Sequence, residues 1–272
     1  MRITKTERRT YEDNGFLFLP ARFSPAEVKT IKAELPTIFA EESPRRVLEK
    51  GSNIVRSVYG SHTTNEVARR LAYHPRIVEP AMQILDGKTY IYQFKINAKA
   101  ASGGDVWEWH QDYIFWQNED GMPTTRVVNA VIFLDDVHEF NGPMIFLPGS
   151  HKEGVIDVSA QETLPAGYQN DPAWIANLTA TLKYSLNQKI MARLVERYGM
   201  VAPKGPAGSV LFFHGNIVHG SAANMSPFAR NLVLVTFNHL ENIPVPTKEP
   251  RPEFLASRDY RPVEPLAETV LC

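Results

Sequence analysis

The stretch "GSVLFFHGNIVHGSAANMSPFARNLVLVTFNH", residues 208–239, contains two runs rich in aromatic and β-branched residues, at 208–214 and 231–239. Gly and Asn bound these runs, which is typical of short β-strands. Three further runs have the same character: "TYIYQFKINA" (89–98), "VVNAVIFLDD" (127–136) and "PMIFLPG" (143–149). Short strands separated by turns predict a β-sandwich or a barrel.

Helical patterns precede these strands. The motif "SPAE" (24–27) is a capping box with proline at the first helical position. A second helical region covers about residues 65–85, with a break at Pro75 and a stop at "DG" (86–87). We therefore expect helices before the strands begin.

Residues 155–205 interrupt the strand pattern. Within this segment, "SLNQ" (185–188) is a capping box that predicts the start of an amphipathic helix. The segment is long enough to close over a small ligand. We expect a single domain over residues 1–272, with a helical part at about 1–86 and a β-core at about 87–245 that carries this insertion.

Composition narrows the class of protein. The chain has 272 residues, 43% hydrophobic and 22% charged, and a formal net charge of −1, so no broad basic field favours nucleic acid or an anionic membrane. Cys272 is the only cysteine, which excludes a disulfide framework and a thiolate metal cluster. No apolar stretch resembles a signal peptide or a membrane span. We expect a cytoplasmic protein, a monomer or weak homodimer, that binds a small molecule.

The segment "VWEWHQDYIFW" (106–116) sets an imidazole and a carboxylate two positions apart among aromatic residues. In a strand, His110 and Asp112 would point to the same face. With His219 they would form two imidazoles and one carboxylate, a ligand set that leaves one face of an octahedral iron open. A hydrogen-bonded pair or a solvated strand edge would also explain His110 and Asp112, and zinc also fits the three ligands.

Arg230 favours iron over these alternatives. It lies eleven residues after His219, directly before a predicted buried strand, where its guanidinium can bind a carboxylate bidentately. Such an arginine beside an open iron site predicts a 2-oxoglutarate site. His214, next to a glycine at a strand end, is better read as a packing residue.

Several longer motifs resemble one known family. "WHQD", "NGPMIFLPGSHKEG" and "LFFHGNIVHGSAANMSPFAR" are similar to the phytanoyl-CoA dioxygenase superfamily of non-haem Fe(II)/2-oxoglutarate oxygenases. Within it, "YIYQFKIN" and "EWHQDYIFWQNEDGMP" look closest to bacterial free amino-acid (leucine) hydroxylases, and next to ectoine hydroxylases. The resemblance implies a mainly β fold, a double-stranded β-helix (jelly-roll, cupin-like) core with flanking N-terminal helices and a helical insertion.

The resemblance also implies cofactors and site residues. The cofactors are Fe(II), 2-oxoglutarate as co-substrate, and O2. The implied metal ligands are His110, Asp112 and His219, and the implied 2-oxoglutarate contacts are Arg230, Ser221, Gln93, Asn97 and Trp107. The candidates for substrate binding are Arg56, Tyr59, His62, Lys95, Tyr113 and Trp116.

The implied activity is hydroxylation of an unactivated C–H bond in a small free amino acid, aliphatic and leucine-like. Two alternatives stay open. One is an oxygenase of another secondary metabolite, either ectoine-like or linked to an acyl group or CoA. The other is a non-enzymatic, cupin-like metal-binding protein. Halogenation is disfavoured, because halogenases of this kind carry a small residue where Asp112 stands.

Overall fold

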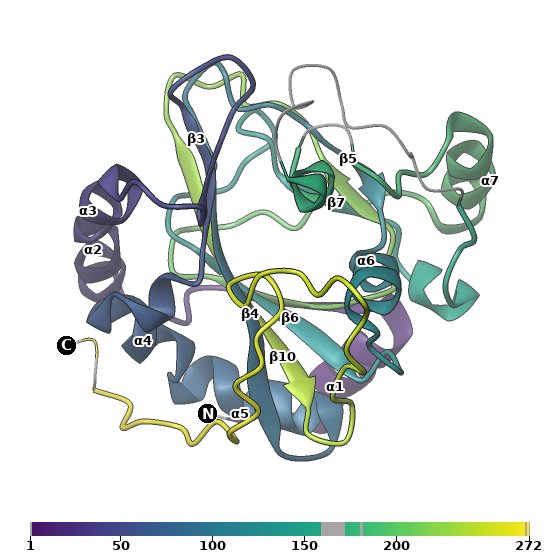
Figure 1. Cartoon of the computed structure of the whole chain (residues 1–272), viewed down its shortest axis with the longest axis horizontal. Helices are drawn as coiled ribbons and strands as arrows, with labels where there is room; N and C mark the ends of the chain where they lie inside the picture. Colours follow the sequence, from purple (N-terminus) through teal and green to yellow (C-terminus); the bar gives the residue numbers. More distant parts are fainter. Residues whose placement is uncertain (1, 159–171, 180–181, 270, 272) are drawn as a thin grey trace.

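Two antiparallel sheets form the body of the protein (Figure 1). The computed structural model describes residues 2–158, 172–179, 182–269 and 271. The larger sheet has the strand order β1 (Phe16–Leu19), β8 (Val210–His214), β6 (Val127–Phe133), β10 (Arg230–His239), β4 (Thr89–Lys99), β3 (Val55–Tyr59) and β2 (Arg46–Leu48). The smaller sheet has the order β5 (Trp107–His110), β9 (His219–Ser221) and β7 (Met144–Phe146). Of the two predicted alternatives, a sandwich or a barrel, the chain forms two facing sheets.

The central strands of the large sheet are buried on both faces. On β6 and β10, Val131 and Leu234 belong to a cluster with Phe146 of the small sheet, whereas their neighbours Ile132 and Val235 pack in the cluster that contains the helices. Because side chains alternate across a strand, one face of each strand meets the other sheet and one meets the helical layer. This explains why these strands read as continuous apolar runs.

Helices from the first third of the chain cover the outer face of the large sheet. They are α2 (Pro25–Ala33), α3 (Leu35–Ala40), α4 (Glu66–Ala72) and α5 (Pro75–Leu85), while α1 (Lys5–Asn14) leads into β1. The capping box at Ser24 is present and α5 stops before Asp86, as predicted; Asp86 itself adopts the left-handed conformation. The first 86 residues are not only helical, however, because they also supply β1, β2 and β3.

Two further elements differ from the sequence-based expectation. The described part of the insertion holds the short helix η3 (Ala173–Asn177) and α7 (Gln188–Tyr198), but Asn187 rather than Ser185 caps α7, because its side chain accepts from the Ile190 N–H. Residues 159–171 and 180–181 of the insertion lie outside the described residues. Residues 106–116 are not one strand, since β5 stops at His110 and α6 (Asp112–Asp120) follows at once.

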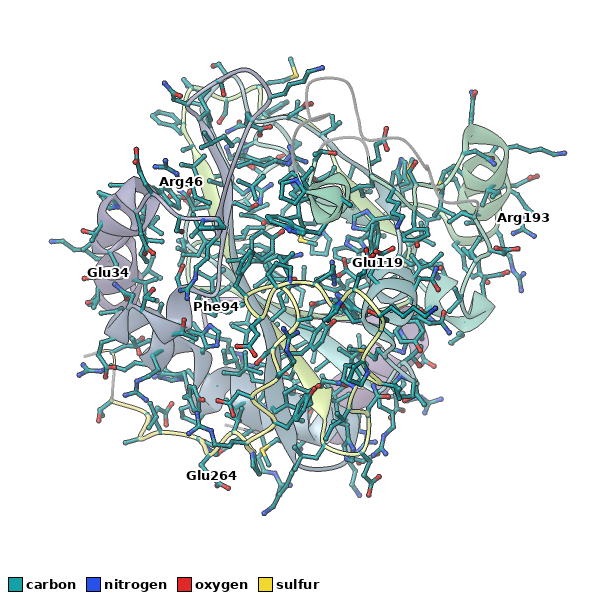
Figure 2. All side chains as sticks on the ribbon, viewed as in Figure 1. Glu34, Arg46, Phe94, Glu119, Arg193 and Glu264 are labelled. Atoms are coloured by element: carbon teal, nitrogen blue, oxygen red, sulfur yellow. The ribbon has the colours of Figure 1, made fainter. Side chains whose placement is uncertain are left out.

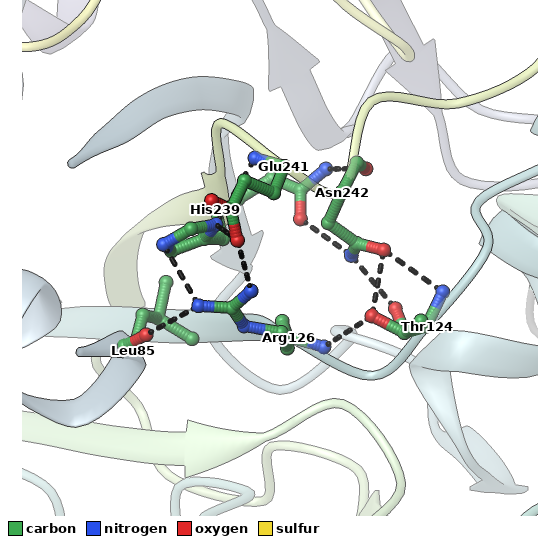
Figure 3. Close-up of polar contacts among 7 residues, drawn as sticks. Leu85, Thr124, Arg126, His239, Glu241 and Asn242 are labelled. Atoms are coloured by element: carbon green, nitrogen blue, oxygen red, sulfur yellow. Dashed lines mark hydrogen bonds and ion pairs between the residues drawn. The ribbon is translucent and has the colours of Figure 1, made fainter. Parts of the chain in front are cut away.

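Arg126 links β10 to α5 at one end of the large sheet (Figure 3). Its guanidinium lies 2.8 Å from Oε2 of Glu241 and 2.9 Å from Nε2 of His239, and it also donates to the Leu85 carbonyl at the end of α5. This cluster holds the C-terminal end of β10, so it lies at the opposite end of that strand from Arg230. The two strand ends therefore have separate roles, one structural and one next to the site described below.

The C-terminal segment, yellow in Figure 1, runs back over β4 and α6 towards α4. Its backbone donates from Ser257 to Tyr92 O at 3.0 Å and from Val263 to Thr89 O at 2.8 Å. The proline-rich tail is thus packed on the body of the protein, and it brings Arg251 into contact with the interior. Among the described residues, no helix combines the length and the apolar character that crossing a membrane requires.

Candidate active site

Three buried side chains converge between the two sheets. His110 ends β5, His219 begins β9 directly opposite it, and Asp112 is the first residue of α6. His110 Nε2 lies 3.5 Å from Asp112 Oδ1, and His219 Nε2 lies 3.9 Å from Asp112 Oδ2. The three ligand atoms all lie within 4.8 Å of one another. One metal ion can therefore contact all three.

Asp112 reaches this position by a route that differs from the predicted one. The alternation of a strand does not align it with His110, because the chain turns from strand to helix between them. Gln111 fixes that turn: its amide donates to Asn216 O at 2.6 Å and to Gly154 O at 2.8 Å, and its oxygen accepts from Ile156 N–H at 2.8 Å.

The surroundings orient the three groups for metal binding. His110 Nδ1 lies 2.6 Å from Glu108 O, and His219 Nδ1 lies 3.1 Å from Ile217 O. A carbonyl oxygen can only accept, so the ring nitrogen that faces it must carry the proton; in each ring Nδ1 is therefore protonated and the Nε2 lone pair is free for a metal. The Asn129 amide donates to Asp112 Oδ2 at 2.9 Å. Ligands with such outer partners are the usual arrangement at metal sites.

Electrostatics favour the forms that bind a cation. Burial, assisted by the neighbouring His110, lowers the pKa of His219 to about 3. Burial by itself would raise the pKa of Asp112, but the neighbouring His219 and Lys95 outweigh it and hold that pKa below its usual range. At neutral pH the site therefore offers a neutral imidazole and an ionised carboxylate.

A cavity opens beside this triad, between β4 and β10 of the large sheet and the small sheet. Arg230 lines it and is 2% exposed. Its Nε donates to Asn141 O at 3.4 Å and its Nη2 to Gly142 O at 2.7 Å. Among the described residues, Nη1 donates to none. Ser221 Oγ and Asn97 Oδ1 also line the cavity, and both are buried without a hydrogen-bond partner among the described residues.

These observations fit an anionic ligand. A buried guanidinium without an ionic partner is unfavourable, and a hydroxyl left without a partner adds to that cost. A carboxylate placed against Arg230 would satisfy both groups. Gln93 and Trp107, also predicted from the sequence, line the same cavity.

Three of the six candidate substrate residues line the cavity and three do not. Tyr59, Lys95 and Trp116 line it. Arg56, His62 and Tyr113 are not among the lining residues. Their groups contact protein instead: His62 stacks on Phe94, which Figure 2 labels, and the Tyr113 hydroxyl donates to Met122 O at 3.0 Å.

Arg56 lies outside the cavity lining and packs against two residues that form it, Trp107 and Leu178. A bulge where β2 pairs with β3 leaves it as the extra residue, and such bulges re-aim side chains. Its guanidinium donates to Leu178 O at 3.1 Å and Val106 O at 2.8 Å, pairs with Glu49, and stacks 3.9 Å from the centroid of the Trp107 ring. All its donor nitrogens are engaged, so Arg56 supports Trp107 and Leu178 rather than facing a substrate.

Arg251 is the main residue that sequence reasoning missed. It lines the cavity from the C-terminal segment and forms a buried bidentate pair with Asp120, whose other contact is the Tyr92 hydroxyl. Nothing in the local sequence "EPRPEF" marks this arginine, because only the return of the tail across α6 places it there. Leu178 and Leu182 of the insertion, also missed, line the cavity too.

The insertion is fixed to α6 beside the cavity. Glu119 of α6, labelled in Figure 2, accepts from Lys183 Nζ at 2.6 Å and from the Tyr184 hydroxyl at 2.7 Å. The Tyr184 ring meets Phe115 edge to face, with centroids 5.0 Å apart. Phe115 lines the cavity, so these contacts close one side of it with aromatic surface.

Known proteins resemble this chain along most of its length. The family model described as phytanoyl-CoA dioxygenase (PhyH) matches residues 11–232. The L-proline trans-4-hydroxylase of Streptomyces griseoviridis is 40% identical over 94% of this chain and 93% of its own length. The ectoine dioxygenase of Bordetella parapertussis is 35% identical over 97% of this chain and 86% of its own length.

Solved structures agree in fold. EctD from S. alaskensis, solved with 2-oxoglutarate and 5-hydroxyectoine, superimposes with a TM-score of 0.79 at 28% identity, over 94% of this chain and 84% of that chain. The same protein with bound Fe gives a TM-score of 0.80 at 29% identity, over 97% and 87% of the two chains. The predicted double-stranded β-helix with flanking helices is confirmed.

Proposed function

The chain belongs to the phytanoyl-CoA dioxygenase family and is a 2-oxoglutarate-dependent dioxygenase, and we propose that it hydroxylates a small free amino acid. The observation that carries the proposal is one cavity with three separate recognition features. These are the His-Asp-His triad, the buried Arg230 without a carboxylate partner among the described residues, and a second buried arginine, Arg251, on the same lining.

The triad would hold Fe(II) through Nε2 of His110, Nε2 of His219 and a carboxylate oxygen of Asp112. Two imidazoles and one carboxylate suit a non-haem iron oxygenase, because they leave positions open for other ligands. Bound iron and 2-oxoglutarate would supply oxygen activation, with 2-oxoglutarate converted to succinate and carbon dioxide as the C–H bond is hydroxylated. The remaining tasks, binding and orientation, belong to the protein's own side chains.

Arg230 and Ser221 would hold the far carboxylate of 2-oxoglutarate. Among the described residues, Arg230 Nη1 and the Ser221 hydroxyl have no hydrogen-bond partner, so both could donate to it, and two donors fix the orientation of a carboxylate. Asn97 and Trp107, which were also predicted from the sequence, line the same cavity. Gln93 of β4 lines it too. Gln93 also donates to Leu255 O at 2.6 Å, so it joins this wall to the C-terminal segment.

Arg251 would bind the carboxylate of the substrate. Its Nε and Nη2 donate to Asp120, which fixes the plane of the guanidinium, and Nη1 donates to none of the described residues. A guanidinium held in this way recognises a carboxylate without losing further conformational entropy. Phe115, Trp116, Leu178 and Leu182 supply apolar walls for a small side chain and exclude water.

A proline-like cyclic amino acid is one substrate candidate that the relatives support. The curated relative at 40% identity is named as an L-proline hydroxylase, and its match covers 93% of its own length. A leucine-like substrate, as expected from the sequence, stays a second candidate because the apolar walls also suit it. An ectoine-like substrate is a third, since ectoine dioxygenases match over 97% of this chain. Ectoine and proline are both small cyclic carboxylic acids with a ring nitrogen.

A direct screen tests the proposal. The purified protein would be supplied with Fe(II), 2-oxoglutarate and O2, and succinate release would be compared for L-proline, L-leucine, ectoine and no addition. Mass spectrometry would then detect the gain of one oxygen atom. We expect stimulation by at least one free amino acid, graded among related ones because one methylene is worth only about 1–3 kcal/mol.

Blocked substrates provide the matched control. The methyl ester and the N-acetyl derivative of the best amino acid should be poor substrates, because each removes a charge. Equal turnover of the blocked forms or of a CoA thioester, or no turnover of any free amino acid, would contradict the proposal. His219→Ala protein should release no succinate above background.

A further inference from the structure

Lys99 and Arg230 are two buried cations on neighbouring strands. They are directly opposite partners in the pairing of β4 with β10, and their relative exposures are 1% and 2%. Directly opposed residues project to the same face of a sheet, and like charges in such a pair are destabilising. Natural proteins accept such a conflict mainly where function requires it.

Neither cation is neutralised by its own contacts. Lys99 Nζ donates to Ala222 O at 2.7 Å and also to Asp105 O, while Arg230 donates to Asn141 O and Gly142 O. Carbonyl oxygens satisfy the donors but carry no full charge. Within the described parts of the chain, neither residue forms an ion pair with a carboxylate.

Together with Lys99 itself, the charged groups that face it carry one positive charge in excess. Arg230 on β10 and Arg56 on β3 act against its charge, and Glu49 and Asp105 act in its favour. Glu49 already pairs with Arg56, 3.1 Å away, so it offsets that cation first. Burial, then Arg230, then Arg56 lower the pKa of the Lys99 ammonium to about 7. Lys99 therefore changes charge within the physiological range.

We propose that Lys99 is a positioning residue for 2-oxoglutarate, which acts through Arg230 by taking up a proton when the far carboxylate of the co-substrate binds. The proposal rests on the proposed function, because it takes Arg230 as the anchor of that carboxylate. An anion at Arg230 cancels the charge that disfavours the Lys99 ammonium. The ammonium then forms and strengthens the field that holds the anion.

Thermodynamic linkage between proton uptake by Lys99 and binding of 2-oxoglutarate predicts an effect large enough to measure. A group whose pKa rises on binding takes up protons, and the ligand binds more tightly where that group is protonated. If binding raises the pKa of Lys99 by about one unit, about half a proton is taken up near pH 7.5. The affinity for 2-oxoglutarate would fall about sixfold between pH 6.5 and 8.5.

Isothermal titration calorimetry tests the proposal without turnover. The Fe(II)-loaded protein, kept anaerobic and without amino acid, would be titrated with 2-oxoglutarate at pH 6.5, 7.5 and 8.5. Two buffers of different ionisation enthalpy at each pH would report the protons taken up. The proteins compared are the wild type, Lys99→Met, Lys99→Arg and, as a matched surface control, Lys204→Met. Lys204 is half-exposed and pairs with Glu139.

Each variant has a distinct expected result. Lys99→Met should lose the proton uptake and most of the pH dependence, and should bind several-fold more weakly than wild type at pH 6.5. Lys99→Arg stays charged, so it should also show no uptake but should bind at pH 8.5 about as tightly as at pH 6.5. Lys204→Met should match the wild type. The hydrogen bonds lost in Lys99→Met would lower thermal stability, yet a purely structural role predicts an equal loss of affinity at every pH.

The outcomes separate this proposal from the proposed function. Binding by the wild type without buffer-dependent heat, or an unchanged pH dependence in Lys99→Met, would overturn the role of Lys99 and leave the dioxygenase assignment standing. No binding of 2-oxoglutarate by the wild type would overturn both together.

Discussion

Asn129 on β6 donates from its amide to Asp112 Oδ2 at 2.9 Å, and its oxygen accepts from the Thr236 hydroxyl of β10 at 2.6 Å. The two central strands of the large sheet thus orient the one carboxylate of the candidate metal centre. Because an ionised carboxylate only accepts, the Asn129 nitrogen faces Asp112, and the Asn129 oxygen is left to accept from Thr236.

Replacing Asn129 with Ala should weaken iron binding. Asp112 Oδ2 would lose its donor, and removing such an outer partner typically lowers metal affinity by about 10–100-fold. Titration of the apoprotein with Fe(II) under anaerobic conditions measures this. Thr236→Val, which leaves the amide in place but frees its orientation, should give a smaller loss, and His219→Ala, which removes a ligand, a larger one. Equal affinity in Asn129→Ala and the wild type would exclude this role.

Replacing Arg230 with Lys should weaken the use of 2-oxoglutarate. The charge remains, but the fork that matches a carboxylate is lost. A charge-assisted hydrogen bond is worth about 1.5–3 kcal/mol, so the apparent KM for 2-oxoglutarate should rise tenfold or more. Steady-state kinetics at saturating iron measure it, with exposed Arg197→Lys as the control. An unchanged KM would mean that another residue holds the far carboxylate.

Replacing Arg251 with Lys should affect the amino acid and spare 2-oxoglutarate. A lysine keeps the attraction to Asp120 but not the planar pair, so the KM for the amino-acid substrate should rise about tenfold. The KM for 2-oxoglutarate should stay within about twofold of wild type, since Arg230 is intact. Asp120→Asn should give the same pattern in weaker form. A rise in both KM values would point to a general disturbance of the cavity.

His62 should make the fold sensitive to mild acid. Burial, followed by the charge of Arg45, lowers its pKa to about 4, and its Nδ1 is buried without a partner among the described residues. In the unfolded chain His62 has a pKa near 6.5 and binds the proton more readily than in the folded protein. The contribution of His62 to the free energy of unfolding is therefore complete above about pH 6.5 and is lost as the pH drops towards 4. The side chain is partly exposed, so we expect a loss on the order of 1–3 kcal/mol.

Urea unfolding at pH 7 and pH 4.5 measures the loss of stability that His62 causes. The difference between the two pH values should be smaller in His62→Gln than in the wild type. His138→Gln provides the matched control, because His138 is half-buried like His62 but its Nδ1 accepts from the Phe140 N–H. The same pH difference in all three proteins would show that His62 does not carry the effect.

Local patterns alone predicted the long strands and several of the helices. The five apolar runs became β4, β6, β7, β8 and β10, and the capping box at Ser24 began a helix, because strand and helix signals depend on near neighbours. Dependence on near neighbours also explains which strands were not predicted. β1, β2 and β3 are short, and their sequences do not differ enough from loops to be recognised before pairing with longer strands stabilises them.

The sequence alone identified the candidate site residues: the spacing of His110, Asp112 and His219 predicts a metal site, and Arg230 before the last strand predicts a co-substrate contact. The tertiary structure alone decided what surrounds them. Arg56 lies outside the cavity lining, because a bulge redirects its side chain. Arg251 lines the cavity, because the C-terminal segment folds back over α6. The tertiary structure also placed Lys99 opposite Arg230. Contacts between residues far apart in the chain depend on packing and register, which the spacing of residues along the sequence does not encode.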